Sequence, residues 1–143
     1  MDILKTILQS TLDDGIIIPI LSLIWLIICA IMDWKNGLIS NWLTMTGMFF
    51  GILNASLNGV DRVFFTIVVF TGCLILFLLR GLGGADVKVL TGLAGLWPAA
   101  VFGALVMQGI WGIVTMVRSG KNAKFRAIPS YALGAAASLI FIL

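Results

Sequence analysis

The sequence predicts an all-α membrane protein, a bundle of six transmembrane helices with both termini outside. The first observation is composition: 61% of the 143 residues are hydrophobic and 10% are charged, against roughly 45–50% and 25% in soluble domains. The second is a mean hydropathy of +1.15, with the apolar residues gathered in six runs. The third is an uneven distribution of Lys and Arg between those runs. A soluble core and a disordered chain are excluded, and we expect one transmembrane domain over residues 1–143.

Each apolar run is bounded by charged residues, glycine, asparagine or proline. In chain order the runs are 15–32, closed by Asp33; 42–57, closed by Asn58 and Gly59; 63–79, flanked by Arg62 and Arg80; 86–97, closed by Pro98; 99–117, closed by Arg118; and 128–143, opened by Ile128 and Pro129. Hydrocarbon leaves the backbone groups no partners outside the segment, so such runs must be helices. A bilayer core takes about 20 helical residues, and the fourth run, at about 18 Å, is the shortest.

The basic residues predict the orientation of these helices. Six spans put both termini on one side, and seven of the nine Lys and Arg residues then lie on the other: Lys35, Arg80, Lys88, Arg118, Lys121, Lys124 and Arg126. Lys5 and Arg62 lie on the side of the termini. The positive-inside rule places the seven in the cytoplasm and both termini outside. A five-helix alternative, in which the fourth and fifth runs merge, spoils this asymmetry.

The titratable residues restrict the chemistry. The acidic residues are six Asp without a single Glu, and the chain has no His, which excludes a Ser-His-Asp triad and most zinc enzymes. Cys29 and Cys73 each lie inside an apolar run, as buried thiols do, and not in a disulfide or metal-site pattern. We therefore expect no metal and no cofactor.

Two of the aspartates stand apart from the rest. The predicted topology leaves Asp33 and Asp86 as the acidic residues at the cytoplasmic edge, at the end of the first helix and the start of the fourth. An ionisable group that lies below the membrane surface is costly and indicates a functional site. Two carboxyl groups that share a site hold one proton between them, as an acid–base pair does.

Glycines precede the second aspartate. Gly81, Gly83 and Gly84 lie before the helix whose first turn holds Asp86, and glycine lets a backbone bend sharply or another chain approach closely. A phosphate loop is not expected, because the Walker pattern ends in Gly-Lys-Ser/Thr and an Asp repels phosphate. Nucleotides are therefore not expected partners. Nucleic acids are not expected either, because no continuous basic face is present.

The motifs around the two aspartates resemble those of a known family. Asp33 is followed after five residues by Ile-x-Asn-x-Leu-Thr, with Asn41 as the asparagine, and the later motif is Gly-x-Gly-x-x-Asp-x-Lys over residues 81–88. This pair is similar to that of the type IV prepilin peptidases, which include the archaeal preflagellin peptidases. The resemblance covers most of the chain and its form is the short one, without a methyltransferase domain. Ser40 and Ala85 stand where the family has Pro and Gly.

The resemblance implies a membrane aspartic endopeptidase that removes leaders from pilin-like or archaellin-like precursors at the cytoplasmic edge of the cell membrane, which the chain crosses several times. Asp33 and Asp86 are the implied catalytic residues, one activating water and the other donating a proton. The implied partners are the precursor and the lipid bilayer.

Other residues are expected to support this site or the packing. Gly81, Gly83 and Gly84 would let a substrate strand pass or the loop move. Lys88 would orient a carbonyl, pair with Asp86 or only mark the interface, and Asn41 would cap the second helix together with Thr44. Small residues are expected at helix contacts: Gly47, Gly51, Ala99, Gly103 and residues 134–138, with Asn54 and Gln108 as interhelical hydrogen-bond formers.

Two other functions stay open at this point. Intramembrane aspartates also serve small proton- or cation-coupled transporters and channel subunits, although both aspartates here are predicted at one edge and not at the midplane. The differences at Ser40 and Ala85 also leave room for an inactive peptidase relative that acts in pilus assembly.

Overall fold

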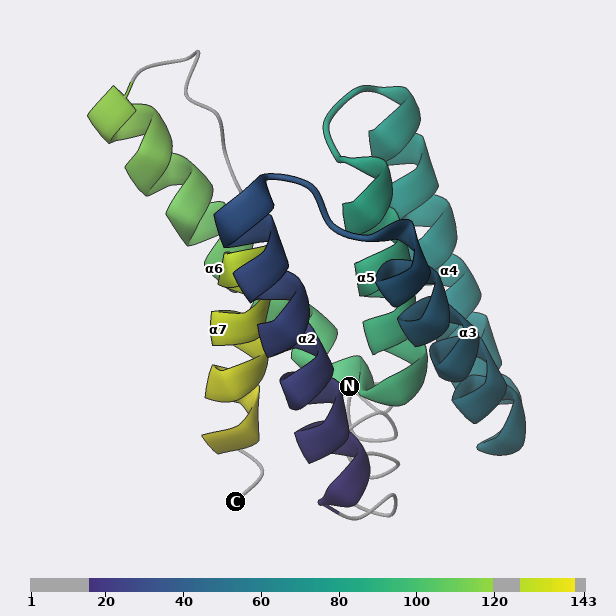
Figure 1. Cartoon of the computed structure of the whole chain (residues 1–143). Coiled ribbons are helices and arrows are strands. Elements are labelled where there is room, and N and C mark those ends of the chain that lie inside the picture. The colour runs from purple at the N-terminus through teal and green to yellow at the C-terminus, as the bar shows by residue number, and fades with distance from the viewer. Residues whose placement is uncertain (1–15, 120–126, 141–143) are drawn as a thin grey trace.

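The computed structural model of the chain describes residues 16–119 and 127–140. Within these residues the fold is all-helical, with six helices and no strand. They are α2 (Ile17–Asn36), α3 (Asn41–Leu57), α4 (Val60–Leu78), α5 (Gly84–Leu96), α6 (Pro98–Ser119) and α7 (Ile128–Ile140) (Figure 1). Each helix corresponds to one predicted run, so the hydropathy pattern located all six. The beginning of the first run and the end of the last lie outside the described residues.

Two helix boundaries near the aspartates differ from the prediction. α2 does not end before Asp33 but continues to Asn36, and Gly37 closes it in the left-handed conformation with a φ of 65°. The Gly37 N–H donates to the Asp33 carbonyl oxygen at 2.9 Å, so a glycine cap ends the helix, not the charge of Asp33. α5 begins at Gly84, which makes Asp86 its third residue.

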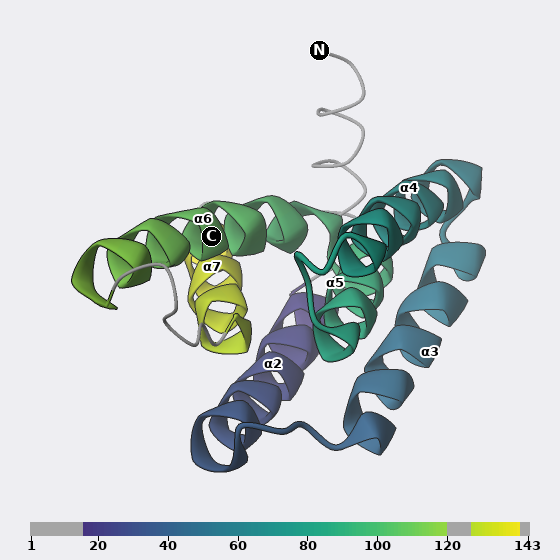
Figure 2. The same ribbon diagram turned by 90° about the horizontal axis from the view of Figure 1, so that it is seen from above.

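α5 is the interior helix of the bundle. It packs chiefly against α3 and α4 and also contacts α2 and α6 (Figure 2). Every residue from Val89 to Gly95 is buried, and α5 exposes no large hydrophobic side chain, whereas each of the other described helices exposes at least two. A helix that is buried on all sides meets protein and not lipid.

Glycine backbones touch at two helix pairs. A Cβ added to Gly95 of α5 would lie 2.0 Å from the carbonyl oxygen of Gly51 in α3, and a Cβ on Gly134 of α7 would lie 2.2 Å from that of Gly103 in α6. Asn54 Nδ2 also donates across α3 and α5 to the Gly95 carbonyl oxygen at 2.8 Å. The helix contacts predicted at Gly51, Gly103 and Gly134 and the interhelical hydrogen bond predicted for Asn54 are confirmed.

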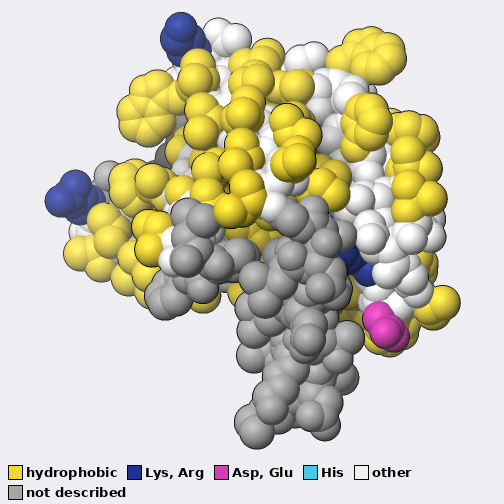
Figure 3. Space-filling model, turned by 90° about the horizontal axis from the view of Figure 1, so that it is seen from below, with side chains coloured by type: hydrophobic (Ala, Val, Ile, Leu, Met, Phe, Trp, Pro, Cys, Tyr) yellow, Lys and Arg dark blue, Asp and Glu magenta, His cyan; other side chains and the backbone are white. Residues whose placement is uncertain are grey.

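The outer surface is strongly apolar. Among the described side chains on the face seen from below, hydrophobic ones far outnumber charged ones (Figure 3). α2, α4 and residues Pro98–Arg118 of α6 are long and apolar enough to cross a membrane, and α7 is a shorter apolar helix. An exposed apolar surface of this extent is that of a membrane protein.

Several of the charged residues on which the predicted orientation rests lie outside the described residues, namely Asp2, Lys5, Asp13, Asp14, Lys121, Lys124 and Arg126. The crossing of the membrane by all six helices and the outward position of both termini therefore stay predictions.

Candidate active site

A small polar pocket lies at the end of the bundle where α2 ends and α5 and α7 begin. Its volume is about 200 Å³, and three parts of the chain line it: Asp33, Gly37, Leu38 and Ile39; Ala85 and Asp86; and Ala127 and Ile128. Asp33 and Asp86, which are 53 positions apart in the sequence, thus reach one cavity. They also lie close enough to act on each other electrostatically.

Asp33 reaches the pocket because of its register on α2. Leu26 and Cys29 lie seven and four residues before it, and both are fully buried. Residues with these spacings share one face of a helix. The interior face of α2 therefore leads to Asp33, whose own side chain is half-buried.

Asp86 is oriented by the residue that precedes α5. Its Oδ2 atom accepts a hydrogen bond from the Gly83 backbone N–H at 3.0 Å. A carboxylate at the third position of a helix commonly reaches back in this way, where the unpaired N–H groups and the helix dipole favour it. The bond restricts the rotation of a side chain that is otherwise only half-buried.

Gly83 contributes space to this arrangement and not an unusual backbone angle. The left-handed residue of the loop is Arg80, with a φ of 60°, whereas Gly83 is extended with a φ of −80°. None of Gly81, Gly83 and Gly84 has the left-handed conformation that favours glycine. A Cβ on Gly83 would lie 2.9 Å from Asp86 Oδ2, while a Cβ on Gly81 or Gly84 would make ordinary contacts.

Lys88 and Asn41 contact each other. Lys88 Nζ donates to Asn41 Oδ1 and so joins α5 to the first residue of α3. The expectation that Asn41 and Thr44 cap α3 is wrong, because Ser40 is the N-cap residue and no side chain bonds the free N–H groups there. Thr44 Oγ1 donates instead to the Asn41 carbonyl oxygen at 3.1 Å.

The two departures from the motif pattern suit the backbone. Ala85 is the second residue of α5, a helical position that favours Ala over Gly. Ser40 has a φ of −56°, close to the value that a proline ring imposes. Both residues are therefore compatible with the backbone conformation at their positions.

Several residues near the aspartates were not predicted from the sequence. Ile39 and Ala127 line the pocket, although neither was expected to serve the site. Tyr131 of α7 is fully buried, and both Tyr131 and Cys73 of α4 lie within electrostatic range of Asp86. The available signal for Tyr131 was that it is the single tyrosine of the chain.

The pocket has the groups that acid–base hydrolysis requires. It offers two carboxyl groups and room for several water molecules, each of which takes about 30 Å³ in the liquid. One carboxylate of a pair that shares a proton can deprotonate water while the other donates the proton. Among the described residues, no group of three or more metal-ligating side chains is present.

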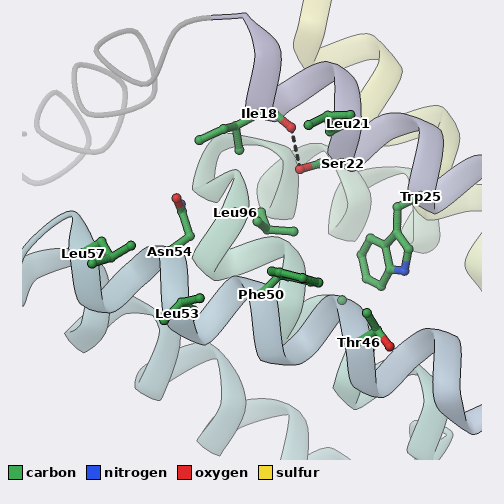
Figure 4. A pocket seen from close by; sticks show the side chains of 11 residues that line it. Ile18, Leu21, Ser22, Trp25, Thr46, Phe50, Leu53, Asn54, Leu57 and Leu96 are labelled. Atoms are coloured by element: carbon green, nitrogen blue, oxygen red, sulfur yellow. Dashed lines mark hydrogen bonds between the residues drawn. The ribbon is translucent and has the colours of Figure 1, made fainter.

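A larger apolar pocket of about 430 Å³ lies between α2 and α3, away from the aspartates. None of its lining residues is titratable. Its polar side chains are already bonded within the protein: Ser22 Oγ donates to the Ile18 carbonyl oxygen at 2.8 Å (Figure 4), and Trp25 Nε1 donates to that of Leu43 at 3.1 Å. This pocket has no catalytic groups.

Comparison with known proteins gives one result. The model of the type IV leader peptidase family matches residues 20–143, a range that contains both aspartates and every residue of the polar pocket. No curated protein matches the chain, and no solved structure matches it.

Proposed function

The chain belongs to the type IV leader peptidase family, and from this premise we propose that it is an aspartic endopeptidase that removes leader peptides from type IV pilin-like or archaellin-like precursors. The observation that carries the proposal is the single pocket that Asp33 and Asp86 both line. Family membership supports a peptidase in a membrane, and the pocket supports a mechanism that uses two carboxyl groups.

In this mechanism the two aspartates divide the proton work. The ionised carboxylate accepts a proton from water while the water oxygen attacks the scissile carbonyl carbon. The protonated carboxyl donates to the carbonyl oxygen and so neutralises the charge that develops there. The C–N bond then breaks, and a proton passes from the dyad to the leaving amine. No metal and no cofactor take part.

The surroundings of the pocket support a substrate at the cytoplasmic edge. Lys35, Arg80, Lys88 and Arg118 lie at or near the ends of α2, α4, α5 and α6 on the side of the pocket (Figure 1). By the positive-inside rule this is the cytoplasmic side. A pilin-like precursor has a short polar leader followed by an apolar helix that shares the bilayer, so its cleavage site lies at the same edge.

Purified protein with a pilin-like precursor tests this function. We expect Asp33→Asn and Asp86→Asn each to lower the cleavage rate at least about a hundredfold, because each variant removes one partner of the proton transfer. Asp61→Asn is the matched control, since Asp61 is exposed and lies in the first turn of α4, away from the pocket. We expect it to cleave as the wild type does.

The contrary result is clear. A folded wild-type protein that cleaves no pilin-like precursor would refute the peptidase assignment and favour an inactive relative or a transporter. Cleavage that survives in either dyad variant would instead refute the two-aspartate mechanism.

A further inference from the structure

Lys88 points away from the catalytic pair. It follows Asp86 by two residues on α5, which corresponds to about 200° around a helix. Asp86 lines the polar pocket, while Lys88 reaches α3 and donates to Asn41 Oδ1. The two side chains therefore serve different faces of one helix, and Lys88 does not line the pocket.

The contact lies within one of the two groups of helices that meet at the pocket, at the residue where the chain enters that group. α2 packs chiefly against α7, and α7 against α6, whereas α5 packs chiefly against α3 and α4. Asp33 comes from the first group and Asp86 from the second. Residues 37–40 cross from one group to the other at this end of the bundle (Figure 2).

This crossing segment is held at both ends. At its start the Gly37 N–H donates to the Asp33 carbonyl oxygen. At its end Asn41 is held by Lys88, two residues from Asp86. Leu38 and Ile39, which lie between these points, form one wall of the pocket.

The electrostatics of α5 do not explain a lysine at this place. Lys88 is the fifth residue of α5, near a helix N-terminus, where the dipole disfavours a cation. Its partner Asn41 is the first residue of another helix and is neutral. The contact is better explained by the position of the segment that it holds.

We propose that Lys88 is a positioning residue: through Asn41 it holds the segment 37–40 against α5 and so sets how Asp33 and Asp86 face each other across the pocket. It does not touch the substrate. The inference rests on the proposed peptidase function for its kinetic consequence, but the ordering of the segment can be measured without any activity.

Kinetics of precursor cleavage test the positioning role. We expect Lys88→Met to lower kcat about ten- to a hundredfold, because a small displacement of catalytic groups has effects of this order, with KM within about twofold. Lys88→Arg keeps a donor and Asn41→Asp keeps an acceptor, so both variants should retain most of the activity. The double variant Lys88→Met/Asn41→Ala should lose no more than Lys88→Met alone, since the two residues act through one contact.

Lys35→Met is the matched control, because it removes a lysine from the last turn of α2 at the same end of the bundle without touching this contact. It should leave kcat unchanged. A wild-type kcat in Lys88→Met, or a loss that falls on KM alone, would overturn the proposal. So would losses in the double variant that equal the product of the two single losses.

A spin label separates this proposal from the proposed function. Leu38 is 79% exposed, whereas Cys29 and Cys73 are buried, so a nitroxide can be attached at Leu38→Cys. We expect the Lys88→Met background to sharpen its spectrum, which reports a more mobile segment, and the Lys35→Met background to leave it unchanged. An unchanged spectrum in Lys88→Met refutes the positioning role even if the protein cleaves no precursor, and a sharpened one supports it in that same case.

Discussion

At the scale of single residues, the contact between Gly83 and Asp86 explains why a glycine precedes α5. Its backbone N–H bonds Asp86 Oδ2, and the carboxylate occupies the space in which a Cβ would stand. The conformation of Gly83 is open to any residue, so the requirement comes from the neighbouring carboxylate. Gly84 is adjacent but has no such neighbour.

These two glycines give a paired prediction. We expect Gly83→Ala to lower the cleavage rate about ten- to a hundredfold, because the new methyl group displaces the Asp86 carboxylate from its hydrogen bond. The thermal unfolding midpoint should change little, since Gly83 is exposed. Gly84→Ala should keep the wild-type rate, because its Cβ meets only Phe77 at 3.6 Å. Equal effects of the two substitutions on the rate would contradict this explanation.

At the scale of helices, α5 depends on glycine in the helix that it packs against. α3 brings Gly51 and the carbonyl group of Gly47 to this contact, and α5 brings Gly92 and Gly95, so the two backbones meet without side chains between them. Close approach of this kind supplies dispersion contacts where lipid removes the hydrophobic drive for association. It also fixes the height of α5, and hence of Asp86, relative to α3.

Substitutions at glycines of different surroundings test this packing. Gly95→Ala places a methyl group 2.0 Å from the Gly51 carbonyl oxygen, and overpacking of this kind costs about 1–3 kcal/mol. We expect a lower unfolding midpoint in detergent and slower cleavage. Gly109→Ala in α6 is the control, because its Cβ meets nothing within 4 Å and alanine favours a helix. The packing role would be wrong if the two variants unfolded alike.

At the scale of the whole molecule, the pocket lies at the same end of the bundle as four of the five described basic residues, Lys35, Arg80, Lys88 and Arg118, while the fifth, Arg62, lies in the first turn of α4 (Figure 1). The exposed Asp61 lies at the beginning of α4, at the opposite end. This separation agrees with the predicted orientation, in which the dyad faces the cytoplasm and both termini face outward.

Labelling of intact cells tests that orientation. A membrane-impermeant maleimide should modify Asp61→Cys from outside and should reach Lys35→Cys only after the cells are opened. Both positions are exposed, and the two native cysteines are buried, so the labelling reports location. Labelling of Lys35→Cys in sealed cells would show that the topology is the reverse of the predicted one.

The sequence by itself determined the membrane class and the six helices, and it predicted the pair of aspartates, because hydropathy and motif spacing are properties of neighbouring residues. Gly37 shows the limit of that reasoning, since it ends α2 one turn later than the charge of Asp33 suggested. Only the tertiary structure decided that Asp33 and Asp86 line one pocket, that Asn41 meets Lys88 from 47 positions away, and that Gly83 makes room for a carboxylate. Those relations depend on how helices pack at close range, and packing joins residues that no local pattern connects.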